Sequence, residues 1–115
     1  MRVINVSKKE LNKCGITSLE EWLKDKQNVY IGRDMTVYVK GAKGSKWANP
    51  FSVKKYGREK CLELYEDYIL NNKELLDNLS ELKNKNLGCW CHPEKCHGDI
   101  LIKLINEKIN YNNQK

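Results

Sequence analysis

Short β-branched segments alternate with amphipathic helical segments along this chain of 115 residues, and the alternation restricts it to a layered α/β fold. The sequence predicts strands at 2–6, 28–32, 35–39 and 86–91, with the second and third able to pair as a hairpin. It predicts helices at 17–26, 57–70, 73–85 and 96–109. We therefore expect a small single-domain open sheet flanked by helices, Rossmann-like in style.

The cysteine content and the net charge limit the classes of function that the chain can have. The five cysteines are unevenly spaced and no export signal is recognisable, so we expect reduced thiols and a cytoplasmic location. No apolar run approaches the roughly 20 residues that cross a bilayer, so we expect no membrane partner. The net charge is +6, and nearly every charged residue at 40–60 is basic. An electrostatic nucleic-acid binder without a pocket is therefore one hypothesis.

The segment CWCHPEKCHGD, residues 89–99, holds three of the five cysteines and both histidines. If residues 89–91 are extended, the two cysteines point to one face and Trp90 to the other. Four side chains of this segment form a candidate tetrahedral zinc set, with His92 as an alternate ligand: Cys89, Cys91, Cys96 and His97. The spacing is tighter than the paired spacing of most structural zinc sites. Burial of Cys89 and Cys91 as small apolar residues is the alternative.

A reactive thiol is the other interpretation of this segment. Cys96 falls where the last helix begins, and the free N–H groups and dipole there stabilise a thiolate. His97 or His92 could shuttle a proton, and Asp99 could orient an imidazole. The same helix start favours a phosphate or carboxylate. We therefore take Cys96, His97 and Asp99 as candidate catalytic residues.

The loop KGAKGSKWANPF, residues 40–51, combines glycines, lysines and aromatic side chains. Trp47 could stack on a base, Asn49 could bind a polar edge, and Lys46 could supply charge. Equally, Trp47 and Phe51 could anchor the loop on the core.

The Trp-Ala-Asn-Pro-Phe and Cys-x-Cys-x-Pro-x-x-Cys-His-x-Asp motifs, with Ile-Gly-Arg at 31–33 and Arg58, resemble an uncharacterised family, domain of unknown function 4326. Its members occur in bacteria, phages and large DNA viruses. The resemblance divides the chain into a strand-and-helix leader at 1–27, a family core at 28–110 and a frayed tail at 111–115. It also implies that the loop and the cysteine segment belong to one site.

These observations predict an α/β domain that binds a nucleotide or a nucleic-acid-derived anion between the loop at 47–51 and the turn at 89–99. Thiol-based hydrolase or transferase chemistry could accompany binding. The expected ligand-binding residues are Arg33, Lys46, Trp47, Asn49, Arg58 and His92. A non-catalytic zinc module that docks on nucleic acid or protein is the alternative.

Overall fold

Three parallel strands form the centre of the computed structural model, which describes residues 1–91 and 94–113, with side chains as far as residue 108. The strand order is β1-β3-β2, so the last strand lies between the first two. The elements in chain order are β1 (Arg2–Asn5), α1 (Lys8–Lys13), α2 (Leu19–Trp22), β2 (Asn28–Tyr30), α3 (Val53–Tyr56), α4 (Arg58–Leu70), α5 (Lys73–Asn78), the 3-10 helix η1 (Leu79–Leu82), β3 (Asn86–Cys89) and α6 (His97–Asn113). The chain is thus the small open α/β fold that the sequence predicts.

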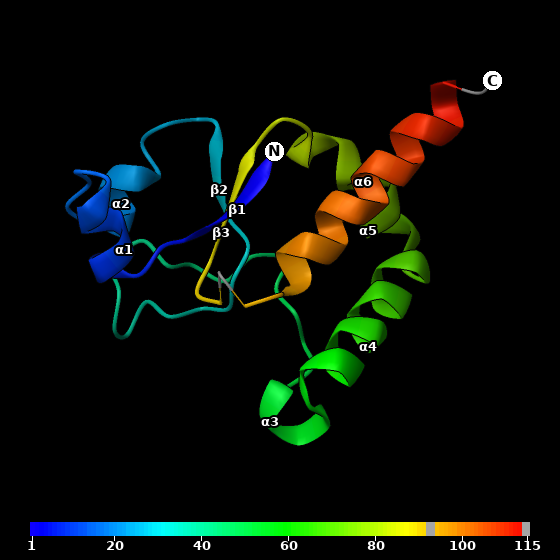
Figure 1. Cartoon of the computed structure of the whole chain (residues 1–115), viewed down its shortest axis with the longest axis horizontal. Helices are drawn as coiled ribbons and strands as arrows, with labels where there is room; N and C mark the ends of the chain where they lie inside the picture. Colours follow the sequence, from blue (N-terminus) through cyan, green and yellow to red (C-terminus); the bar gives the residue numbers. More distant parts are fainter. Residues whose placement is uncertain (92–93, 114–115) are drawn as a thin grey trace.

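The sheet separates two helical layers. Figure 1 shows α1 and α2 on one side of the strands and α4, α5 and α6 on the other. Side chains alternate along the strands, so Val3, Leu87 and Cys89 enter the larger core beneath α4 and α6. Tyr30 and Val6 enter the smaller core beneath α1 and α2. Trp90 packs against that smaller core, and Cys91 packs against the larger one, as the predicted alternation requires.

The segment 35–39 is not the predicted strand, and no hairpin forms with β2. The Asp34 carboxylate accepts hydrogen bonds from the backbone N–H and the hydroxyl of Thr36, which turns the chain immediately after β2. A second turn follows, because the Val39 N–H donates to the Met35 carbonyl at 2.8 Å. Val37 consequently projects from the surface with 87% of its area exposed.

Several helix boundaries differ from the predicted ones. The predicted helix 17–26 forms only at α2, where the Ser18 hydroxyl accepts from the Glu21 N–H as the capping-box pattern predicts. The same pattern at Ser7 and Glu10 caps α1, which the sequence analysis missed. Serine capping also starts the unpredicted α3, at Ser52. Residues 111–113, expected in a frayed tail, continue α6, whereas 114–115 lie outside the described residues.

The described part of the chain contains no helix that is both long and apolar enough to cross a membrane.

Gly88 makes the central strand sensitive to overpacking. A Cβ atom there would lie 2.7 Å from ring carbons of Trp22 and 2.9 Å from a methyl group of Val6. We expect Gly88→Ala to lower the free energy of unfolding by about 1–3 kcal/mol, because both neighbours are buried. Urea denaturation measures this. The exposed Ser80→Ala should stay within about 0.5 kcal/mol of the parent, and an equal loss in both variants would contradict the close contact.

Candidate ligand and metal site

A cavity of about 350 Å³ lies beyond the carboxyl ends of β2 and β3. This is where ligands bind in open parallel sheets. The loop at 40–51 and the turn at 89–99, distant in sequence, both reach it. Its lining includes Gly32, Arg33, Met35, Asn49, Phe51, Ser52, Val53, Lys54, Arg58, Cys61, Leu62, Cys89, Trp90, Cys91, Cys96 and His97.

A group of sulfur and imidazole side chains forms one wall of the cavity. One ligand atom each from Cys89, Cys96 and His97 lies within 4.8 Å of the other two, and these residues are 3%, 2% and 7% exposed. The half-buried Cys91 lines the same cavity and lies near enough to Cys89 and Cys96 to affect their pKa values, but it is not part of this compact group. Three residues of the predicted zinc set therefore lie together and are buried, and Cys91 lies beside them.

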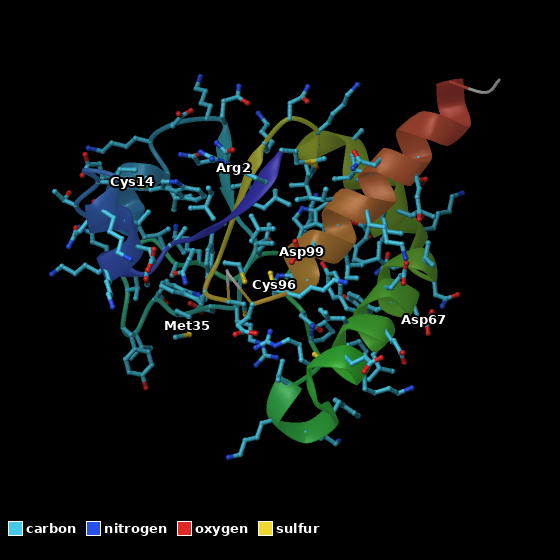
Figure 2. All side chains as sticks on the ribbon, in the orientation of Figure 1. Arg2, Cys14, Met35, Asp67, Cys96 and Asp99 are labelled. Carbon is cyan, nitrogen blue, oxygen red and sulfur yellow. The ribbon has the colours of Figure 1, made fainter. Side chains whose placement is uncertain are left out.

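The start of α6 fixes two members of this group. Cys96 occupies the N-cap position, where its sulfur accepts from the Gly98 N–H at 3.4 Å. The Asp99 carboxylate accepts from the Cys96 N–H at 2.9 Å, which completes a capping box with cysteine in the place of serine. Figure 2 shows Cys96 and Asp99 at this helix start. The carboxylate predicted to orient an imidazole thus caps the helix.

His97 is held by a backbone carbonyl group just beyond the end of β2. Its Nε2 lies 2.8 Å from the Ile31 carbonyl oxygen, which can only accept, so Nε2 carries the proton. Burial lowers the pKa of His97 and favours the neutral ring. Nδ1 therefore keeps the lone pair that a metal ion requires, and the Ile31 carbonyl orients the ring as outer-shell partners of ligating histidines do.

The cysteines of the cluster influence one another's pKa values, and the predicted thiolate at Cys96 stays a prediction. Hydrogen bonds from Cys89 and Cys96 lower the pKa of Cys91 to about 2, and the Arg58 guanidinium contributes further. The interaction with Cys91 raises the pKa of Cys89, and the interactions with Cys89 and Cys91 raise the pKa of Cys96. Cys96 is buried, whereas Cys91 is half-buried, and both line the cavity.

Two arginines bring positive charge to the cavity and brace its walls. Arg33 donates from Nε to the Asn49 carbonyl at 3.1 Å and from Nη2 to the Phe51 carbonyl at 2.9 Å, which ties the loop to the end of β2. Arg58 donates to the Lys95 carbonyl at 2.8 Å and contacts the sulfur of Cys91. Each guanidinium has five N–H donors, so both keep donors for a ligand.

Asn49 shapes the loop from within. Its Oδ1 accepts from the Phe51 N–H at 2.9 Å, and its Nδ2 donates to the Cys61 sulfur at 3.1 Å. The residue is only 9% exposed. It lines the cavity, and these two bonds leave its second Nδ2–H and the second lone pair of Oδ1 for other partners.

Two other predicted ligand-binding residues, Trp47 and Lys46, do not line this cavity. Trp47 is 2% exposed, with its indole N–H on Glu81 and its carbonyl accepting from Tyr65, so it anchors the loop in the core and has no face free for a base. Lys46 pairs with the same Glu81 at 2.8 Å. His92 lies outside the described residues.

Lys54, Met35, Trp90 and Cys61 line the cavity but were not among the predicted site residues. For Lys54 the signal was its place in the basic segment that follows the Asn-Pro-Phe motif. The position of Met35 at the cavity was not predictable, because the sequence predicts a strand at 35–39 and the chain turns there instead.

Together these features define a small parallel α/β domain with a cysteine–histidine cluster beside a cationic cavity. The family model for a domain of unknown function, DUF4326, matches residues 16–107. The chain belongs to this family, as its motifs indicated.

Two viral proteins are similar to the chain. The uncharacterized protein R718 of Acanthamoeba polyphaga mimivirus is 37% identical over 99 residues, which covers 76% of this chain and 75% of the relative. An uncharacterized 12.4 kDa protein from the nrdA-td intergenic region of Enterobacteria phage T4 is 34% identical over 68 residues, 56% of this chain and 63% of the relative. No solved structure matches the chain.

The capping role of Asp99 is testable by stability. We expect Asp99→Ala to lower the free energy of unfolding by about 0.5–2 kcal/mol, because the Cys96 N–H loses its acceptor. Asp99→Asn should lose less, since an amide oxygen can still accept. Chemical denaturation gives the values, with the exposed Asp77→Ala as the matched control. If Asp99→Ala and Asp77→Ala had equal effects, the cap would not contribute.

Proposed function

We propose that this domain binds a nucleotide or a nucleic-acid-derived anion in the cavity at the carboxyl ends of β2 and β3. One observation carries the proposal. Arg33, Lys54 and Arg58 line the cavity, and none of its lining residues within the described chain is an aspartate or a glutamate. A cavity with only positive ionisable side chains, apart from thiols and one imidazole, favours an anion and disfavours a cationic ligand.

The start of α6 adds to this attraction. Cys96 and His97, its N-cap and first residue, both line the cavity. The N-terminus of a 17-residue helix carries a partial positive charge, which stabilises phosphate or carboxylate nearby. Arg33 and Arg58 have unused N–H donors on guanidinium groups, and such groups match the geometry of phosphate oxygens. A phosphate is therefore the anion that the walls suit best.

The volume of the cavity and its apolar walls restrict the class of ligand further. Met35, Phe51 and Leu62 supply apolar surface beside the cations, where a ring can pack. The cavity volume of about 350 Å³ lies near the lower end of the roughly 300–1,000 Å³ usual for small-molecule sites. A single nucleotide, free or at the end of a strand, fits this space better than the interior of a polynucleotide.

Neighbouring lysines provide a matched test of binding. Lys54 lines the cavity, whereas Lys55 packs its ammonium over the Tyr56 ring. We expect calorimetric titration with nucleoside 5′-monophosphates to show saturable binding that Lys54→Gln and Arg58→Gln weaken by about 10-fold or more, because each removes a charged donor. Lys55→Gln should bind like the parent, and nucleosides without phosphate should bind far more weakly.

Equal weakening in Lys54→Gln and Lys55→Gln would contradict the cavity and favour the electrostatic nucleic-acid binder predicted from the basic segment. That mode should depend steeply on salt and not on the cavity residues.

A zinc-binding module is the second candidate, favoured by the close approach of Cys89, Cys96 and His97. Tetrahedral zinc holds neighbouring sulfur and nitrogen ligands roughly 3.5–3.8 Å apart, so atoms within 4.8 Å need only small shifts. Cys91 supplies a further thiol at the same place, and Nδ1 of His97 has the required lone pair. In this function the domain docks on nucleic acid or protein, and the metal supports its fold.

Metal content and stability test this candidate. We expect the purified protein to contain about one equivalent of zinc, and a strong chelator to lower its melting temperature, because zinc bound to the folded state stabilises it. Cys96→Ser should lose the metal, while Cys14→Ser, at an exposed cysteine remote in sequence, should retain it. Metal-free protein with an unchanged melting temperature after zinc addition would exclude the zinc module.

A further inference from the structure

The four residues of the cluster are not equivalent in position. Cys89 is the last residue of β3, and Cys96 and His97 begin α6, so regular elements fix all three. Each is tied by a hydrogen bond: the Cys89 carbonyl accepts from Val6, the Cys96 N–H donates to Asp99, and His97 bonds the Ile31 carbonyl. Cys91 lies two residues beyond the end of β3 and is only half-buried.

All four residues line the cavity, so a metal ion held there would have one side toward the ligand space. Structural zinc sites are closed by four protein ligands, whereas sites that act on a ligand keep one position open, as in a two-cysteine, one-histidine arrangement. The three buried ligand atoms match that second pattern. Cys91 lies outside that group of three but lines the same cavity and is half-buried.

We infer that Cys89, Cys96 and His97 hold a zinc ion, and that its fourth position accepts either the Cys91 thiolate or the anionic group of the ligand in the cavity. This inference rests on the proposed function, since it joins the metal and the anion in one site. It assigns the ligand a coordinating group, a phosphate or a carboxylate, that exchanges with Cys91.

Charge supports the exchange. Zinc with two thiolates and a neutral imidazole has no net charge, so a fourth, anionic ligand makes the centre negative, by one charge for a thiolate or carboxylate and by up to about two for a phosphate. The Arg58 guanidinium beside Cys91 stabilises that charge when the thiolate is bound. Arg58, Arg33 and Lys54 all line the same cavity and offer the same stabilisation to an entering anion. The walls thus favour an anion in the fourth position whichever group provides it.

Cobalt(II) can replace zinc and absorbs visible light, so its spectrum can distinguish the contribution of Cys91 from those of Cys89, Cys96 and His97. We expect Cys91→Ser to bind one equivalent of cobalt with a weaker sulfur-to-metal absorption band. Cys89→Ser, Cys96→Ser and His97→Asn should bind it about 100-fold more weakly or not at all. Cys14→Ser serves as the control for loss of a cysteine outside the site. Circular dichroism of each variant without metal shows whether it remains folded.

Titration of the cobalt-loaded protein with inorganic phosphate and with a nucleoside 5′-monophosphate then tests the exchange. Both the parent and Cys91→Ser should change their visible spectra, and Cys91→Ser should saturate at a lower anion concentration, because no thiolate competes. A variant Cys91→Ser that loses the metal as Cys89→Ser does would overturn the inference in favour of a closed four-residue site. Calorimetric anion binding without a spectral change would also overturn it, while leaving the anion cavity intact. Absence of any metal binding would overturn both the inference and the zinc module.

Discussion

The central place of β3 is the constraint on which the rest of the structure depends. β1 and β2 do not pair with each other; each pairs in parallel with β3. Because side chains alternate along this strand, Cys89 and Cys91 face the larger core and Trp90 faces the smaller one. The same strand that completes the sheet therefore carries the sulfur atoms to its carboxyl end, where the turn into α6 adds Cys96 and His97.

Much of the fold follows from local sequence. The apolar spacing of α4 and α6 and the β-branched character of β1 and β2 are strong signals, and the structure confirms them. The prediction of a strand at 35–39 was wrong. The alternation of side-chain types there suits a strand, but the hydrogen bonds between Asp34 and Thr36 turn the chain. The strand order could not be derived, because it depends on which strands pair in space.

The sequence predicts which residues gather at the site better than it predicts what each of them does there. The cysteines, His97, Arg33 and Arg58 come together at one cavity, but burial then decides what each can do. Trp47 has the residue type of a base-stacking platform, yet its position beneath the loop makes it core. Cys96 has the helix-start position expected of a reactive thiol, yet among the three cysteines of residues 89–96 it is Cys91 that remains partly exposed. Such differences depend on packing between distant segments, which spacing along the chain does not encode.

The order β1-β3-β2 also has a consequence for biosynthesis. While the ribosome is still making the first 85 residues, the two outer strands have no partner, so the sheet cannot close during that interval. Sheet closure and assembly of the cysteine–histidine cluster then occur within the same short stretch of translation. The residues of the cluster thus reach their relative positions only once the central strand has joined the outer two.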